Sequence, residues 1–223
     1  MGPALLFCPA DRPERYQKAA ERSDAVIVDL EDAVAPSHKD EARRQTLAYL
    51  AAPPASCAVG FRINALTSID GFLDVAAFAQ NGALAAFIMI PKTSCAFEIR
   101  QMQGALGASC PPLWPLIETP DALPAIYEIA AAVGEGGGLM FGGADYAASI
   151  GSDMGWDGLY MARAAIVAAA AAAGCATIDV PYLDVKDEAG LRAESARVRA
   201  MGFTGRACIH PAQVGPINAV FTP

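Results

Sequence analysis

The sequence has little charge, very little histidine and no excess of basic residues. Charged residues make up 18% of the 223 residues, only two residues are histidine, and the formal net charge is −8. This composition argues against nucleic acid as a partner, because contacts with phosphates need clustered lysine and arginine. It still allows small anionic substrates, which need only a few well-placed cations.

The six cysteines form no Cys-x-x-Cys pair, and the sequence contains no Gly-x-Ser-x-Gly motif. These absences leave little support for a zinc or thioredoxin-like site and none for a serine hydrolase. Several cysteines lie within apolar runs, so we expect buried, reduced thiols in a cytoplasmic protein. The N-terminus reaches Asp11 too soon for a secretory signal, and the apolar run Ala164–Ala173 is too short to span a membrane.

The main positive feature is a series of eight short apolar runs. They begin about thirty residues apart, the length that a strand, a loop, a helix and a return loop need. Strands and helices alternating in this way indicate a parallel α/β fold. The runs are Ala4–Pro9, Ala25–Leu30, Ala58–Ile63, Ala85–Ile90, Leu113–Ile117, Leu139–Gly143, Ala176–Val180 and Ala207–Ile209.

Helix patterns with recognisable ends lie between the runs. Pro13 opens the first after Asp11, and several later patterns stop at a glycine, which commonly follows a helix C-terminus. The other predicted helices cover Ser37–Leu50, Ile69–Gln80, Pro120–Val133, Leu159–Ala173 and Asp187–Ala200.

We predict a single domain over residues 1–223, a (β/α)8 (TIM) barrel with a short or incomplete C-terminal helix. The alternative is an open doubly wound sheet, which normally has a glycine-rich turn after an early strand, and the Gly134–Gly138 cluster lacks that spacing. The chain is shorter than the roughly 250 residues typical of such barrels. After Ile209 we therefore expect a very short closing helix, or a segment that is missing or supplied by a neighbouring subunit.

Acidic residues follow two neighbouring runs of this predicted barrel. Glu118 and Asp145 come after the fifth and sixth runs, so their carboxylates are expected to converge at the barrel mouth. Two carboxylates with water and a chelating substrate can hold Mg²⁺. The equally weighted alternative is that each carboxylate stabilises the N-terminus of the next helix.

The second run ends in three acids, Asp29, Glu31 and Asp32. Crowded carboxylates raise one another's pKa and suit general acid–base chemistry, although helix capping and solvation explain them as well. Arg62 ends the third run, and a guanidinium at a barrel mouth suits bidentate carboxylate binding. Arg12 can do the same from the first run.

The motifs at these positions resemble a known family over nearly the whole chain. The sequence is similar to the citrate lyase β-subunit-like proteins of the HpcH/HpaI aldolase and citrate lyase superfamily. The matching segments are LLFCPADRPERYQKAA, DAVIVDLEDAVAPSHKDEAR, FRINA, IMIPKT, LIETPDAL, MFGGADYAASIG, TIDVPYLDVKDEAGL and GFTGRACIHPAQVGPINAVFTP.

The resemblance implies a (β/α)8 barrel in homotrimers or hexamers, with Mg²⁺ and acyl-CoA and keto-acid ligands. It implies that Glu118 and Asp145 bind the metal, that Glu118 also contacts substrate, and that Arg62 with Arg12 binds the keto-acid carboxylate. It places Glu31 and Asp32 beside the metal. Two departures from the family pattern are Ala144, where an acid is common, and a C-terminus at Pro223, where many relatives continue into a segment that lends an aspartate to a neighbouring subunit.

We therefore expect a Mg²⁺-dependent carbon–carbon lyase acting on a short 3-hydroxyacyl-CoA such as citryl-CoA or malyl-CoA. Glu31 or Asp32 is the expected general base, and Arg62 the expected carboxylate-binding residue. The alternatives are a CoA-independent class II aldolase acting on pyruvate-derived hydroxy acids, and a non-catalytic protein that binds acyl-CoA or keto acids. No membrane association is expected.

Overall fold

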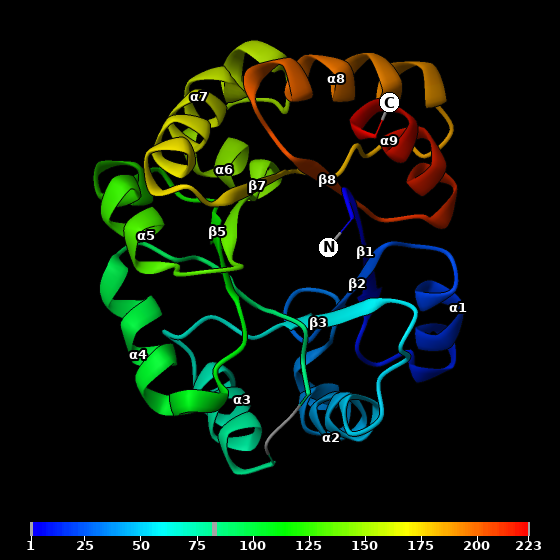
Figure 1. The fold of residues 1–223 in the computed structure, drawn as a ribbon, viewed down its shortest axis with the longest axis vertical. Helices are drawn as coiled ribbons and strands as arrows, with labels where there is room; N and C mark the ends of the chain where they lie inside the picture. The colour runs from blue at the N-terminus through cyan, green and yellow to red at the C-terminus, as the bar shows by residue number, and fades with distance from the viewer. Residues whose placement is uncertain (1, 82–83, 223) are drawn as a thin grey trace.

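A computed structural model of the chain describes residues 2–81 and 84–222. Its eight strands pair in chain order, and β8 pairs with β1 to close a parallel barrel, which confirms the predicted fold (Figure 1). The strands are β1 Ala4–Pro9, β2 Ala25–Asp29, β3 Ala58–Arg62, β4 Ile88–Ile90, β5 Leu113–Ile117, β6 Gly138–Phe141, β7 Ala176–Asp179 and β8 Gly205–Cys208.

Nine α-helices within the described residues surround the strands (Figure 1). They are α1 Tyr16–Ala20, α2 Lys39–Leu50, α3 Ile69–Asn81, α4 Ala96–Leu106, α5 Ile126–Ala132, α6 Gly143–Ile150, α7 Trp156–Ala173, α8 Glu188–Met201 and α9 Val214–Phe221. Short 3-10 turns cover Pro13–Arg15, Pro36–His38, Gly107–Ser109, Pro120–Ala125 and Pro211–Gln213. No helix in the described part of the chain is long and apolar enough to cross a membrane.

Alternating side chains along each strand divide the core into two layers. One apolar cluster fills the space between the strands and the helices. The other fills the barrel interior with side chains from successive strands: Leu5, Ile27, Met89, Trp114, Leu116, Met140, Ile178 and Ala207. The interior is therefore packed below the ends of the strands, and an open site can form only above this layer.

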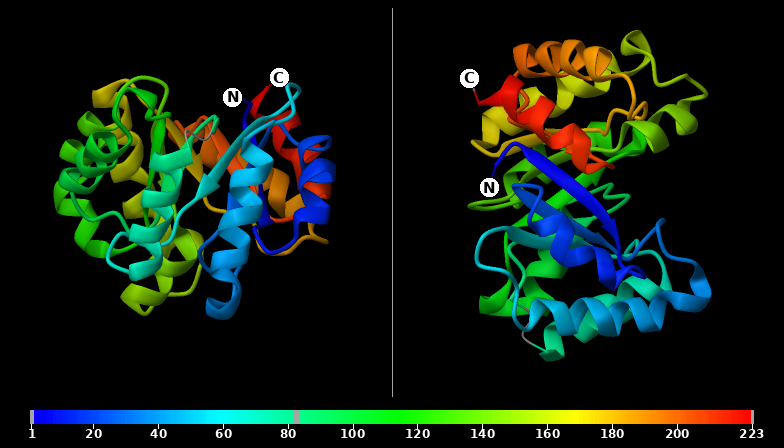
Figure 2. Two further views of the ribbon diagram at one scale, coloured as in Figure 1. Left: turned by 90° about the horizontal axis from the view of Figure 1, so that it is seen from below. Right: turned by 90° about the vertical axis from the view of Figure 1, so that its right-hand side faces the viewer.

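The chain closes its own barrel with a short helix, one of the two outcomes that the sequence left open. Helix α9 packs against α8 and β1 (Figure 2, right). Ile217 within this helix is fully buried. A neighbouring subunit is not needed to cover the eighth strand.

The structure also corrects three details of the predicted elements. Helices α4 and α6 were not expected from the sequence. The helix expected over Pro120–Val133 begins as a 3-10 turn and becomes α-helical at Ile126, since Pro124 has no N–H to donate. Strand β8 begins at Gly205, two residues before the predicted run Ala207–Ile209, and therefore includes the charged residue Arg206. The Arg206 guanidinium is buried in an ion pair with Asp179.

Candidate active site

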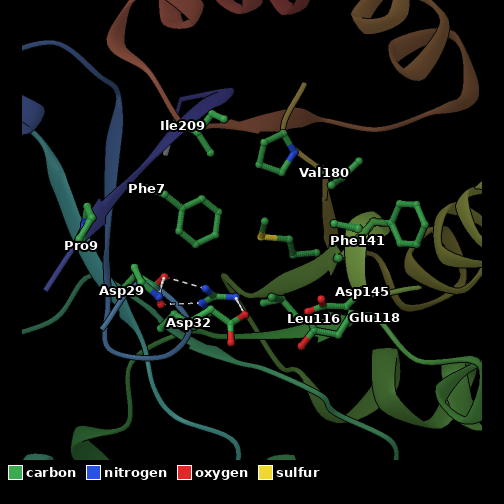
Figure 3. A pocket seen from close by; sticks show the side chains of 16 residues that line it. Phe7, Pro9, Asp29, Asp32, Leu116, Glu118, Phe141, Asp145, Val180 and Ile209 are labelled. Carbon is green, nitrogen blue, oxygen red and sulfur yellow. Dashed lines mark hydrogen bonds and ion pairs between the residues drawn. The ribbon is translucent and has the colours of Figure 1, made fainter. Parts of the chain in front are cut away.

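A cavity of about 440 Å³ opens at the C-terminal ends of the strands (Figure 3). In TIM-barrel enzymes the active site lies at this face. Acidic side chains gather along one side of the cavity and apolar side chains along the other (Figure 3). The lining residues are Phe7, Pro9, Asp29, Asp32, Ala33, Arg62, Leu116, Glu118, Met140, Phe141, Gly142, Ala144, Asp145, Val180, Pro181 and Ile209.

Arg62 and Asp29 form a bidentate pair at one end of the acidic side. They are register partners on neighbouring strands, with Nε 2.7 Å from Oδ1 and Nη2 2.6 Å from Oδ2. Nη1 of Arg62 also lies 2.9 Å from Oε2 of Glu31. Burial alone would lower the pKa of Arg62, but the carboxylates of Asp29, Glu31 and Asp32 raise it above its ordinary value. The guanidinium is therefore a fixed positive charge at the cavity wall.

Glu31 lies behind Arg62 and is held from its other side by Lys92. The Lys92 ammonium donates to Oε1 of Glu31, and its backbone N–H donates to Oε1 of Glu118 at 2.6 Å. Burial raises the pKa of the Glu31 carboxyl, while Arg62 and Lys92 oppose that shift. Lys92 has φ of 52°, in the left-handed region that non-glycine residues rarely adopt, so this contact is made at some cost in backbone strain.

Sequence reasoning did not assign Lys92 a role in the site. The available signal was its position two residues after the apolar run that ends at Ile90, in the segment IPKT. Its contacts with both Glu31 and Glu118 become visible only when β2, β4 and β5 are placed side by side in the barrel.

Glu118 and Asp145 lie together on the acidic side, as predicted (Figure 3). Burial raises the pKa of the Glu118 carboxyl to about 8, and the charges of Glu31 and Asp145 also contribute. A Cβ on Gly142 would lie 2.4 Å from Cβ of Glu118, so a glycine is needed here for the carboxylate to fit. Among the described residues, no cationic side chain forms an ion pair with either of these two carboxylates.

This arrangement leaves both carboxylates available to a magnesium ion, although Asp145 also lies in the first turn of α6, where a carboxylate is favourable. Across residues 2–81 and 84–222, no hydrogen bond or ion pair involves the Asp145 carboxylate. In the same residues, the Glu118 carboxylate accepts one hydrogen bond, from the backbone N–H of Lys92, and none from the helix that follows it in the chain. Oxygen ligands are what Mg²⁺ prefers. The described residues contain no cluster of three or more histidine, cysteine, aspartate or glutamate ligands. Water and substrate would therefore complete the coordination shell.

The remaining candidate residues are placed differently from one another. Asp32 lines the cavity, with 58% of its side chain exposed and an oxygen 3.7 Å from Nη1 of Arg62. Arg12 is not part of the cavity lining: its side chain is 56% exposed, 3.8 Å from Asp11, and faces a separate surface hollow with His38. The structure thus brings Glu31, Asp32, Arg62, Glu118 and Asp145 together and leaves Arg12 outside the cavity.

Comparisons with known proteins agree with this fold. Residues 4–211 match the family model for HpcH/HpaI aldolase/citrate lyase. The chain is 38% identical to a (3S)-malyl-CoA thioesterase of Cereibacter sphaeroides, over 99% of this chain and 77% of that protein. It is 34% identical to an L-malyl-CoA/beta-methylmalyl-CoA lyase of the same species, over 98% of this chain and 78% of the relative.

A solved structure of Mycobacterium tuberculosis CitE in complex with magnesium, acetoacetate and coenzyme A superimposes with a TM-score of 0.86. The two chains are 34% identical, and the match covers 100% of this chain and 81% of CitE. The family model and the relatives each extend over most of this sequence. The chain therefore belongs to the HpcH/HpaI aldolase/citrate lyase family.

Proposed function

We propose that this protein is a Mg²⁺-dependent carbon–carbon lyase that cleaves a short 3-hydroxyacyl-CoA into a 2-keto acid and acetyl-CoA. The observation that carries the proposal is the pair Glu118 and Asp145, which form no ion pair with a cation in residues 2–81 and 84–222. They lie in one cavity with the buried guanidinium of Arg62. Membership of the family and the lyase named among the relatives support it.

In this proposal Glu118 and Asp145 hold Mg²⁺, which when bound stabilises the negative charge that develops on the substrate hydroxyl oxygen. Arg62 binds the substrate carboxylate beside it. A guanidinium has five N–H donors, and the hydrogen bonds to Asp29 occupy two of them, whereas the contact with Glu31 is an ion pair without a hydrogen bond. Three donors therefore remain for a ligand that enters the cavity.

A general base must take the proton of the substrate hydroxyl, and Glu31 and Asp32 are the proposed candidates. Asp32 lines the cavity directly, whereas Glu31 is bound to Arg62 and Lys92. Arg12 lies outside the cavity lining, so it is proposed to contribute only weakly to binding of the substrate carboxylate.

Two other reactions and one non-catalytic role are compatible with the same carboxylates. A CoA-independent class II aldolase would use them on hydroxy acids, and a binding protein would hold the ligands without turnover. A thioesterase is added because a relative with 38% identity carries that name. These reactions release different products, so one experiment distinguishes them.

The experiment is turnover of malyl-CoA, citramalyl-CoA and citryl-CoA with and without Mg²⁺, with acetyl-CoA, free CoA and keto acid measured separately. The lyase releases equal amounts of acetyl-CoA and keto acid, and only when Mg²⁺ is present. Free CoA and the intact hydroxy acid would identify a thioesterase. Release of keto acid from the CoA-free acid would identify the aldolase, and binding without products would contradict catalysis.

We also propose that the protein is a cytoplasmic homo-oligomer, a trimer or hexamer. Six free cysteines suit a reducing compartment. Large exposed apolar side chains lie on α3 and α4, including Ile69, Phe72 and Phe97. Apolar side chains clustered at the surface commonly mark subunit contacts. A monomer in light scattering at micromolar concentration would contradict this assembly.

A further inference from the structure

A network of polar side chains lies behind the cavity and ends at the β2 loop, residues 30–34. Lys39, the first residue of α2, donates from Nζ to the backbone oxygens of Leu30 and Glu31, both at 2.9 Å. Its third contact is Oδ1 of Asn64 at 2.5 Å. An ammonium has three N–H donors, so these contacts use all of them. The cation is therefore committed to the backbone of the β2 loop.

The network begins where the pairing between β2 and β3 stops. The Leu30 N–H donates to the Arg62 oxygen at 3.0 Å, and in a parallel ladder the next bond would join the Asn64 N–H to the Leu30 oxygen. Here the Asn64 N–H donates to Oδ2 of Asp74 at 2.8 Å, and the Leu30 oxygen accepts from Lys39. Charged side chains thus replace strand pairing as the support of the β2 loop.

The far end of the network fixes where the Lys39 ammonium lies. Asn64 accepts from Lys39 through Oδ1 and donates through Nδ2 to Oδ2 of Asp74 at 2.8 Å. Asp74 is fully buried, and Nε of Arg43 lies 2.7 Å from its Oδ1. Burial raises the pKa of the Asp74 carboxyl, and Asn64 and Arg43 oppose that shift. With a cation on one side and a carboxylate on the other, the Asn64 amide has a single favourable orientation.

We propose that Lys39 is a positioning residue for the general base, because it fixes the loop that carries Glu31 and Asp32. The inference rests on the proposed lyase function and adds to it a residue that is not among the described residues of the cavity lining. The Glu31 backbone is held on both sides, by Oδ1 of Asp29 on its N–H at 3.0 Å and by Lys39 on its oxygen. A displacement of about 1 Å in a reacting group can cost about 100-fold in rate, so an anchored loop keeps the base in place for the substrate hydroxyl.

Lys39→Met tests this role, since it removes the ammonium and keeps an unbranched side chain. We expect kcat with Mg²⁺ to fall about 10–100-fold for whichever of malyl-CoA, citramalyl-CoA and citryl-CoA the wild-type protein cleaves fastest. Affinity for pyruvate in calorimetry with Mg²⁺ should stay within about threefold of wild type, because Arg62 keeps its bidentate pair with Asp29. A merely structural role would lower the thermal midpoint and leave kcat of the folded protein unchanged.

Hydrogen exchange reports on the β2 loop without any need for turnover. The N–H groups of Glu31 and Ala33 donate to the Asp29 carboxylate at 3.0 and 3.3 Å. In Lys39→Met, exchange in peptides covering residues 30–34 should be at least about fivefold faster than in wild type. Peptides from the barrel strands should keep wild-type exchange, which shows that the fold is intact.

Arg44 provides a matched control on the same helix. Its exposed side chain contacts Glu41 within α2. Arg44→Met therefore removes a cation from α2 without touching the β2 loop, and should leave kcat and loop exchange as in wild type. Lys39→Gln keeps N–H donors without the charge, and replaces Lys39→Met in these measurements if Lys39→Met does not fold. A smaller fall in kcat in the same direction is expected for Lys39→Gln.

The outcomes separate this inference from the proposed function. Wild-type kcat or unchanged loop exchange in Lys39→Met would overturn the role of Lys39 while leaving the lyase proposal standing. A loss of pyruvate affinity as large as the loss of kcat would also overturn it, since the network would then support binding in general. Absence of Mg²⁺-dependent keto-acid release by wild type from all three thioesters would contradict the proposed function itself, and with it the inference.

Discussion

Two buried arginine–aspartate pairs lie on opposite sides of the barrel wall. Arg62 and Asp29 meet inside the barrel mouth. Arg163 of α7 and Asp179 of β7 meet outside the strands, with Nε 3.0 Å from Oδ1 and Nη2 3.1 Å from Oδ2. The two pairs have the same bidentate geometry and low exposure, and both aspartates end an apolar strand.

They differ in what surrounds them. Arg163 lies 4.9 Å from the centroid of the Trp156 ring, and Arg206 bonds to Glu194 and to the backbone oxygen of Val180. Burial raises the pKa of Asp179, and the two arginines oppose that shift. Within the described chain, none of these charged groups lines the cavity. The outer pair, Arg163 and Asp179, is enclosed, and together with Arg206 and Glu194 it links β7, β8, α7 and α8. The inner pair, Arg62 and Asp29, lines the cavity and leaves guanidinium donors for a ligand.

Strand geometry explains the difference. Ile178 belongs to the interior cluster, so its neighbour Asp179 points out toward the helices. Ile27 and Leu116 also belong to that cluster, so Asp29 and Glu118, two residues further along, point inward. A shift of one residue along the strand thus separates a charge buried among the helices from a charge that lines the cavity.

The largest expected effect on stability comes from breaking the outer pair. Arg163→Met leaves Asp179 fully buried with Arg206 as its remaining cation, and should lower the free energy of unfolding by about 3–5 kcal/mol in urea titrations. Arg62→Met should lower the free energy of unfolding by less than Arg163→Met does, because water in the cavity can reach Asp29 and Glu31. Equal losses in the two variants would contradict the distinction between the pairs.

The largest expected effect on activity comes from the acidic side of the cavity. Asp145→Asn should reduce Mg²⁺-dependent turnover at least about 100-fold, since stabilisation by the metal contributes several kcal/mol. Its free energy of unfolding should change by less than about 1 kcal/mol, because the side chain has no partner among the described residues. Turnover within tenfold of wild type would remove Asp145 from the metal site.

A smaller effect is expected when the guanidinium is replaced without loss of charge. Arg62→Lys keeps the cation but loses the planar fork, so keto-acid affinity in calorimetry should fall by about 1–3 kcal/mol. Arg62→Lys that binds as tightly as wild type would show that the guanidinium serves only to hold Asp29 and Glu31.

The smallest effect is expected at Arg12. Its half-exposed side chain lies 3.8 Å from Asp11 and outside the cavity lining, so Arg12→Ala should change keto-acid affinity by less than about 1 kcal/mol. A loss as large as that of Arg62→Lys would show that the β1 loop moves Arg12 into the site when substrate binds.

The sequence was sufficient to predict the barrel, because each of the eight apolar runs overlaps one of the eight strands. It did not reveal α4, whose N-cap is Cys95, a residue outside the usual capping set, although Glu98 completes a capping box there. Helix α6 was hidden by Gly142 and Gly143 at its start, since glycine disfavours helix. Tertiary packing stabilises both helices.

The site was predictable only in part. Strands of a parallel barrel are apolar on both faces, so the sequence alone does not reveal which strand-end acids point inward. Asp29 and Asp179 each end an apolar run, and only their positions relative to the interior residues Ile27 and Ile178 separate them. Lys92 and the exclusion of Arg12 from the cavity depend on loop conformations that strand periodicity does not describe.

The most direct test of the central claim is a crystal structure of the protein with Mg²⁺ and pyruvate. The account predicts one ion at about 2.0–2.1 Å from an oxygen of both Glu118 and Asp145, with the keto-acid carboxylate facing Arg62. An ion bound elsewhere, or pyruvate bound without contact to these carboxylates, would contradict it.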